Sequence, residues 1–287
     1  MSSHQEIIDA LTAFYKQVTK HLSLDEVALK EAPAQGWNID AAALQYGGKT
    51  EAVLKLLQHI PYLEVAKGGD SPAIWDDTIP IDYRTKKRSF MDDVNPLPEH
   101  CVYLTEGIFQ DGFSLIVDTE KGTITEYSIL DRNVTADPDD LEMMPDSEKW
   151  RGHRTLPAAE LLGIWTSIFA RLIKMLVPNV SFTPGTGIVH TRLPIRNEAE
   201  MHAKDTDELE EWHPSEEELQ ASTRRTKNES LRQLQMDQRR HIADVYNSFL
   251  RHGWNKDFDK EACRVEVTEL EEQIFAKEMA HAESQVS

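Results

Sequence analysis

The residues best suited to chemistry lie between His59 and Tyr83. His59 ends an amphipathic helical segment and is followed closely by Tyr62. A histidine has an ordinary pKa of about 6.5, so His59 is a candidate general base, with Tyr62 as a proton donor or acceptor beside it. A histidine at a helix end also commonly bonds the last free carbonyl groups, and the sequence leaves both interpretations open.

A loop rich in carboxylates follows this segment. Asp76 and Asp77 are adjacent, and Asp82 and Tyr83 come shortly after them. Paired carboxylates match the fork of a guanidinium group, so these residues are candidates for binding a substrate that carries one. Loop carboxylates also form turns and helix caps, which is the competing interpretation.

Sequence motifs for cofactors and metals are missing from the chain. It has no glycine-rich nucleotide loop, no serine-hydrolase elbow and no calcium-binding loop. His190, His202 and His213 are too widely spaced to match a zinc-binding pattern. We therefore expect neither a cofactor nor a metal ion.

A mixed fold must position these candidates. Apolar residues at helical spacing predict helices over 4–22 and 51–58, the second capped by Thr50. Alternating residues predict three strands, over 101–106, 113–119 and 123–130, joined as an antiparallel meander. The most hydrophobic helix is expected over 157–177. The predicted fold class is α+β, mainly helical, with this small three-stranded sheet packed on that central helix.

The C-terminal part is predicted to be helical after an acidic stretch. Residues 197–218 are rich in carboxylates and are expected to form a solvated linker or insertion within a single domain over residues 1–287. Ser215 and Glu218 match a capping box, which predicts a long helix to about residue 251, ended by Gly253. Asp259 should cap a last helix.

Composition restricts the class of partner. The formal net charge of −19 argues against broad nucleic-acid binding, including DNA. No apolar run has the length of a membrane span, and the N-terminus lacks the features of a secretory signal. We expect a cytoplasmic protein that binds no membrane. Two basic clusters oppose the overall charge, and solvated surface charge is the simpler explanation of both: Arg84, Lys86, Lys87 and Arg88, and Arg224, Arg225 and Lys227.

Three segments of the chain are similar to a pattern found in other proteins. They are LLQHIPYLE at 56–64, SLIVDTEKGTITEYSI at 114–129 and VYNSFLRHGWNKDFDKEAC at 245–263. They resemble a large group of filamentous-fungal proteins that share a Leu-Leu-x-His-Leu-Pro-Tyr element, an Asp-Thr-x-x-Gly hairpin and a His-Gly-Trp turn. The characterised proteins placed nearest to this group are the fungal arginine-containing cyclodipeptide synthases.

That resemblance implies a biosynthetic enzyme of secondary metabolism. Such a transferase takes arginine and a second amino acid from aminoacyl-tRNAs and joins them in a diketopiperazine, by acyl transfer without ATP or a metal. It implies proton transfer by His59 or Tyr62. It implies contacts to the arginine substrate by Asp76, Asp77, Asp82 and Tyr83. It implies contacts to tRNA by Lys86, Lys87, Arg88, Arg224 and Arg225.

Two other classes of function stay open. One is a non-catalytic, acidic protein-binding or regulatory module similar to the SUKH proteins, and the other is a structural protein without a small-molecule site. An enzyme should show a pocket where His59, Tyr62 and the loop carboxylates converge. A binding module should show an exposed apolar patch or a broad acidic face.

Overall fold

The computed structural model describes residues 3–39, 48–64, 71–85, 89–181, 187–192 and 209–286. They form a mixed helix and strand structure with small antiparallel sheets, which confirms the broad α+β class. The chain divides into two compact units, which are described separately. The first unit comprises residues 1–19 and 25–166, and the second comprises residues 20–24 and 167–287. The single domain expected from the sequence stays a prediction.

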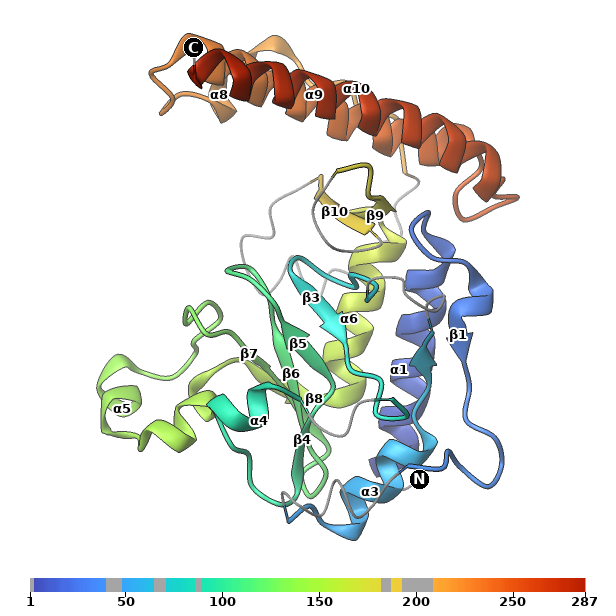
Figure 1. Cartoon of the computed structure of the whole chain (residues 1–287), viewed down its shortest axis with the longest axis vertical. Helices are drawn as coiled ribbons and strands as arrows, with labels where there is room; N and C mark the ends of the chain where they lie inside the picture. The colour runs from blue at the N-terminus through green and yellow to red at the C-terminus, as the bar shows by residue number, and fades with distance from the viewer. Residues whose placement is uncertain are drawn as a thin grey trace. The chain divides into compact units, whose positions relative to one another are not determined.

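A four-stranded antiparallel sheet forms the centre of the first unit (Figure 1). Its strands, in spatial order, are β4 (Cys101–Tyr103), β6 (Ser114–Asp118), β7 (Thr123–Tyr127) and β8 (Thr155–Pro157). In this register Cys101 lies opposite Asp118, and Pro157 lies opposite Thr123 at the edge of the sheet. The sheet therefore has four strands, and the expected three-stranded sheet is not confirmed.

The first predicted strand, 101–106, is divided into two. After β4, the chain continues as β5 (Thr105–Gly107), which pairs with β3 (Thr78–Pro80) in a separate sheet. The Thr105 hydroxyl accepts a hydrogen bond from the Leu115 N–H and donates one to the Phe113 carbonyl. This side chain replaces backbone bonds to β6, so the ladder is interrupted there.

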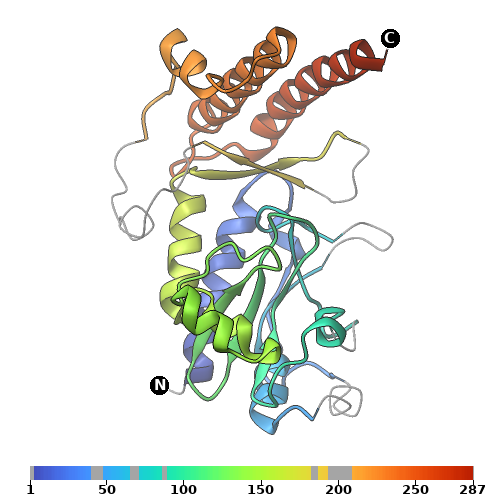
Figure 2. The same ribbon diagram turned by 90° about the vertical axis from the view of Figure 1, so that its left-hand side faces the viewer.

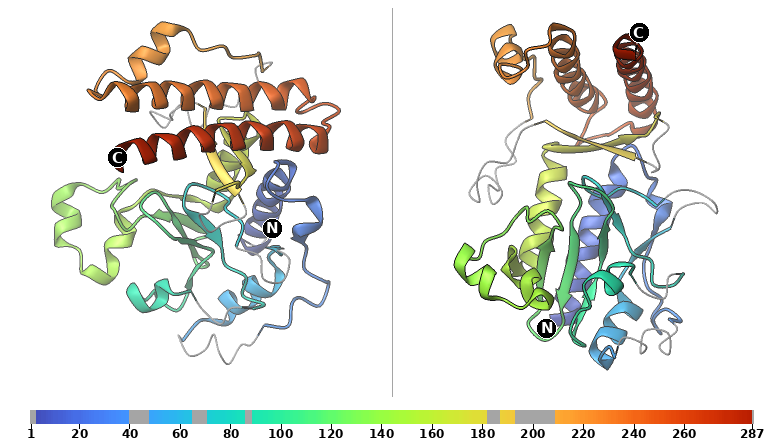
Figure 3. Two further views of the ribbon diagram at one scale, coloured as in Figure 1. Left: turned by 45° about the horizontal axis from the view of Figure 1, so that its top comes forward. Right: turned by 60° about the vertical axis from the view of Figure 1, so that its left-hand side comes forward.

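Two helices cover the sheet of the first unit. They are α1 (Ser3–Lys20) and α6 (Ala158–Ala170), which lie side by side in Figures 1 and 3. Phe14 of α1 meets Trp165 of α6 edge to face, with ring centroids 5.6 Å apart, and Trp165 stacks on Trp75 at 4.2 Å. The shorter elements of this unit are η1 (Glu26–Ala28), β1 (Leu29–Lys30), α3 (Glu51–His59), β2 (Tyr62–Leu63), α4 (Met91–Val94), α5 (Pro138–Met143) and η2 (Asp146–Gly152).

The predicted helix over 157–177 is wrong at both ends. Pro157 is the last residue of β8, and α6 begins at Ala158. The helix stops at Ala170, Leu172 takes a positive φ of 51°, and β9 (Lys174–Pro178) follows. An unbroken apolar run suits a buried strand as well as a buried helix, so hydrophobicity alone could not separate the two elements.

The second unit combines a strand pair with a helix hairpin. β9 pairs with β10 (Gly187–Thr191), and α9 (Glu229–Arg251) turns back into α10 (Lys260–Val286). Figure 2 shows the two strands lying along one side of this hairpin. Its core includes Val177, Phe249 and Trp254. None of the described helices is both long enough and apolar enough to cross a membrane.

The capping signals of the second unit are confirmed, but the helix they were assigned to is interrupted. The capping box of Ser215 and Glu218 opens α8 (Glu216–Ser222), and Asn228 then caps α9 separately. Gly253 has a φ of 84° just beyond the C-cap of α9, and the Asp259 carboxylate accepts a hydrogen bond from the Ala262 N–H at 3.0 Å. Of the acidic stretch 197–218, residues 197–208 lie outside the described residues.

Candidate functional site

His59 lies at the end of α3, beside an open groove of about 980 Å³ in the first unit. Its Nδ1 donates a hydrogen bond to the Lys55 carbonyl at 2.8 Å, as expected of a histidine that caps a helix. Tyr62 is buried, and its hydroxyl donates to the Leu57 carbonyl at 2.7 Å. Burial, and then the charge of Asp82, hold the pKa of Tyr62 well above its ordinary value.

The loop carboxylates do not line the groove that His59 borders. Asp82 binds Arg84 through both carboxylate oxygens, at 2.9 and 2.7 Å, and the Arg84 guanidinium lies over the Trp37 and Tyr62 rings. Asp82 therefore does recognise a guanidinium, but one that belongs to this chain.

The other predicted substrate residues have their own contacts in the first unit. Oδ2 of Asp77 accepts a hydrogen bond from the Asp111 N–H at 3.2 Å, and the carbonyl of Asp76 accepts one from the Thr78 hydroxyl at 2.8 Å. Tyr83 is buried and donates to the Tyr103 carbonyl at 2.8 Å. The convergence expected of a substrate pocket is not found among these residues.

The predicted tRNA-binding residues fall into two groups. Lys86, Lys87 and Arg88 lie outside the described residues. Arg224 and Arg225 are exposed in the turn between α8 and α9.

Two histidines and a glutamate of the second unit form a cluster that the sequence did not predict, called here the His–Glu–His group. His190 comes from β10, His241 from α9 and Glu271 from α10. Both Nε2 atoms lie against the same carboxylate oxygen, Oε1 of Glu271, at 2.7 and 2.8 Å. The Glu271 side chain is 3% exposed, that of His241 is 7% exposed and that of His190 is 16% exposed.

Electrostatics determine the protonation of this group. Burial alone would raise the pKa of Glu271, but the hydrogen bonds and charges of His190 and His241 outweigh it and lower that pKa to about 2. Glu271 is therefore ionised at neutral pH and can only accept, so each imidazole must present its Nε2–H to Oε1. A neutral imidazole in this tautomer carries its lone pair on Nδ1.

The His–Glu–His group lines a cavity of about 480 Å³. The remaining wall is mostly apolar and includes Val180, Ile188, Ile242, Ile274 and Phe275. A cavity of this size with an apolar wall and a few converging polar groups is typical of small-molecule sites.

Two clusters of the described residues carry suitable ligand atoms for a metal ion, the His–Glu–His group and His100, Cys101 and Asp118 in the first unit. Two ligands of one tetrahedral zinc ion lie about 3.4 to 3.6 Å apart, given the usual bond lengths. The 2.7 and 2.8 Å contacts of Glu271 are shorter than this and are ordinary charge-assisted hydrogen bonds. Acid–base chemistry fits this group better than metal binding does.

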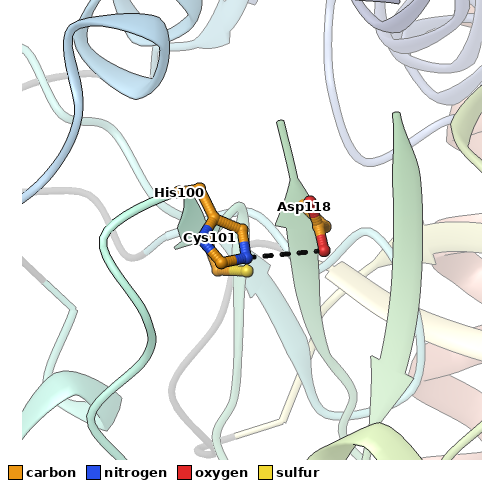
Figure 4. A group of neighbouring side chains, drawn as sticks. All are labelled: His100, Cys101 and Asp118. Atoms are coloured by element: carbon orange, nitrogen blue, oxygen red, sulfur yellow. Dashed lines mark ion pairs between the residues drawn. The ribbon is translucent and has the colours of Figure 1, made fainter. Parts of the chain in front are cut away.

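The second cluster has different spacing (Figure 4). Nε2 of His100 lies 3.7 Å from Oδ2 of Asp118, too far for a hydrogen bond. Cys101 is the cross-strand partner of Asp118. Burial, and then the charge of Asp118, raise the pKa of the Cys101 thiol to about 12.

Sequence analysis considered His190 but not its partners. His202 lies outside the described residues, and exposed His213 contacts only Glu211, at 3.2 Å, in the interactions found for it. The sequence contains one signal for Glu271, because Val267 and Ile274 lie at helical spacing on either side of it. In the structure all three residues are buried. A charged residue on such an apolar stripe requires a buried partner.

Comparison of the chain with protein-family models, with curated proteins and with solved structures found no match of any kind. Its function is therefore inferred from the contacts described above.

Proposed function

We propose that this protein is an acyl-transfer enzyme that uses the His–Glu–His group as a general base in the cavity of the second unit. One observation carries the proposal: two imidazoles are oriented by a single buried carboxylate at the wall of a mainly apolar cavity. A histidine held by a carboxylate through one nitrogen is the arrangement that activates nucleophiles in many unrelated enzymes.

His190 is the more exposed of the two histidines and is assigned as the base. Its Nδ1 takes a proton from an amine or a water molecule as that nucleophile attacks an ester carbonyl. The ester C–O bond then breaks, and the imidazolium returns the proton to the departing oxygen. Glu271 stays ionised and stabilises the imidazolium, while His241 holds Glu271 in place through its own hydrogen bond.

This reaction class agrees with the one that the fungal resemblance implies, because a cyclodipeptide synthase must also deprotonate an amine beside an ester. The residues differ, since His59 and Tyr62 lie in the first unit and neither lines this cavity. The aminoacyl-tRNA donor, the arginine substrate and the cytoplasmic location stay predictions.

A protein-binding module is the second candidate, and exposed apolar residues of the first unit favour it. Ile108, Phe109, Ile129 and Leu130 are exposed on the segments that follow β5 and β7. An ion pair between Arg132 and Asp111 connects those segments. Together they present an apolar surface of the kind that contacts partners.

The acyl-transfer proposal is tested by expression in a bacterial host, with mass spectrometry of the medium for arginine-containing diketopiperazines. In parallel, the purified protein is assayed with a p-nitrophenyl ester and an amine acceptor. We expect His190→Gln and Glu271→Gln to lower the rate by about 10² to 10⁴-fold, the usual contribution of a positioned base.

His252→Gln is the matched control. Its Nε2 lies 2.8 Å from Glu266, so it is another histidine–carboxylate pair of the second unit, but it does not line the cavity. The reaction rate of the His252→Gln variant should equal that of the wild type. Loss of activity in His59→Gln with full activity in His190→Gln would overturn the assignment in favour of the groove in the first unit.

Chelation separates acid–base chemistry from metal chemistry. The rate should be unchanged by EDTA if the His–Glu–His group acts as a base. A rate that is abolished by EDTA and restored by zinc only while Glu271 is intact would contradict the general-base proposal.

A further inference from the structure

We propose that His100, Cys101 and Asp118 of the first unit bind a zinc ion. This inference is independent of the acyl-transfer proposal, because the residues belong to a different unit and none lines the cavity of the second unit. The observation behind it is that an imidazole nitrogen, a thiol and a carboxylate oxygen all lie within 4.8 Å of one another.

The spacing fits two ligands of one ion better than a direct contact. The 3.7 Å between Nε2 of His100 and Oδ2 of Asp118 exceeds a hydrogen bond and is close to the separation of about 3.4 Å between nitrogen and oxygen ligands of tetrahedral zinc. Small side-chain movements would bring both atoms to bonding distance. Figure 4 shows the imidazole of His100 and the thiol of Cys101 on the side that faces Asp118.

The backbone around the cluster holds its ligands in place. Oδ1 of Asp118 accepts hydrogen bonds from the N–H groups of Glu120 and Lys121, both at 3.0 Å, which fixes the carboxylate and directs Oδ2 toward His100. The carbonyl of His100 accepts from the N–H and the hydroxyl of Thr119, at 3.0 and 2.8 Å. Hydrogen bonds from surrounding groups that orient the ligands are a regular property of metal sites, and here they fix the Asp118 carboxylate and the backbone of His100.

Charge balance also favours a divalent ion. Asp118 is 4% exposed, and in the ion pairs found for it Oδ2 lies 3.7 Å from Nε2 of His100 and 3.8 Å from the Lys121 ammonium, which belongs to a side chain that is 66% exposed. A zinc ion would bind the thiolate and the carboxylate with no residual charge. The Cys101 thiol would release one proton to solvent on binding, and a water molecule would complete the four-coordinate shell.

The ligand set selects the kind of metal. A thiolate with an imidazole and one carboxylate suits zinc, whereas magnesium and calcium prefer sites made of oxygen alone. By joining the end of β6 to the residues that open β4, the ion would connect two neighbouring strands of the sheet.

The test uses the full chain, stripped with EDTA and titrated with Zn²⁺ against a chromophoric chelator. The matched control is Cys263, the other buried thiol, which lies 3.8 Å from the Ser248 hydroxyl. We expect His100→Gln and Cys101→Ser to weaken zinc binding at least tenfold, and Cys263→Ser to leave it unchanged. Bound Co²⁺ should give a thiolate-to-metal absorption band that only Cys101→Ser removes.

Thiol alkylation provides a readout that does not depend on the fold of any variant. In the wild-type protein, zinc should slow alkylation of Cys101 and leave that of Cys263 unchanged. Equal protection of both thiols would overturn the proposal. So would zinc binding that survives Cys101→Ser and is lost in Glu271→Gln, which would place the ion in the second unit.

Discussion

The indole nitrogen of Trp165 donates a hydrogen bond of 2.6 Å to Oε1 of Glu126, inside the first unit. The second oxygen of the same carboxylate accepts from the Arg154 guanidinium at 2.8 Å and from the Asn133 amide at 3.1 Å. Glu126 and Arg154 are 2% and 5% exposed. A buried ion pair of this kind connects β7 to α6 and to the segment that precedes β8.

Removing the charge of Glu126 should destabilise the first unit. Glu126→Gln removes the carboxylate charge that pairs with the buried Arg154 guanidinium, and breaking a buried ion pair usually costs about 3–5 kcal/mol. Trp165→Phe removes one donor and should cost about 1–3 kcal/mol. Urea unfolding followed by circular dichroism measures both. Glu142→Gln, at an exposed position of α5, is the control, and an equal effect there would contradict the role assigned to Glu126.

Acid should destabilise the second unit through His21. Burial lowers the pKa of His21 to about 3, and the charges of Lys260 and Lys20 add to that effect. Between pH 3 and about 6.5 the unfolded chain binds a proton at His21 that the folded chain does not. The contribution of neutral His21 to the free energy of unfolding is therefore fully present above pH 6.5 and is lost as the pH falls toward 3. This one group changes the free energy of unfolding by at most about 1.4 kcal/mol per pH unit.

His21→Phe isolates this contribution. The ring packs against Phe169, Phe249 and Trp254, with centroids 4.7 to 5.4 Å away, so an aromatic replacement keeps most of the contacts. We expect unfolding free energies measured from pH 4 to 7 to have a smaller slope in this variant than in the wild type. Identical slopes would show that His21 does not titrate as described.

Asp82 should contribute to stability rather than to substrate binding. A double-mutant cycle of Asp82→Ala and Arg84→Ala should give a coupling of about 1 kcal/mol, because the pair is bidentate and only partly exposed. The exposed pair of Lys16 and Glu31 is the control and should show little coupling. If Asp82→Ala raised KM and left stability unchanged, the substrate role predicted from the sequence would be supported.

Replacing two glycines of the first unit by alanine should change its stability in opposite directions. At Gly163, in α6, an added Cβ meets nothing within 4 Å, so Gly163→Ala should stabilise by about 0.5–1 kcal/mol. At Gly112 an added Cβ would lie 2.6 Å from the Gly107 Cα, which belongs to a buried strand. Gly112→Ala should therefore lower the melting temperature, and thermal unfolding distinguishes the two results.

Local signals in the sequence predicted local structure well. Thr50, Ser215 and Asp259 cap helices as their side chains suggested, because capping depends on neighbouring residues only. The change from helix α6 to strand β9 could not be predicted in the same way. The buried residues of β9 owe their strand conformation to pairing with β10, which is a tertiary contact.

The contacts of the predicted site residues could not be foreseen for a related physical reason, and their roles stay predictions. His59 and Tyr62 have suitable side chains, but the hydrogen bonds that engage them become visible only in the folded chain. The His–Glu–His group draws on three elements, and His190 and Glu271 are far apart in sequence. A single sequence contains the spacing within one helix, but not which helix faces which strand.

Pro157 has a consequence for how the first unit meets other chains. It ends β8, the short strand at one edge of the four-stranded sheet, and it has no N–H to offer a neighbouring strand. A partner strand, or a second copy of the chain, would find an incomplete row of hydrogen-bonding groups along that edge. Proline at this position therefore protects the sheet against edge-to-edge aggregation, and contacts with partners are expected to use side-chain surfaces there.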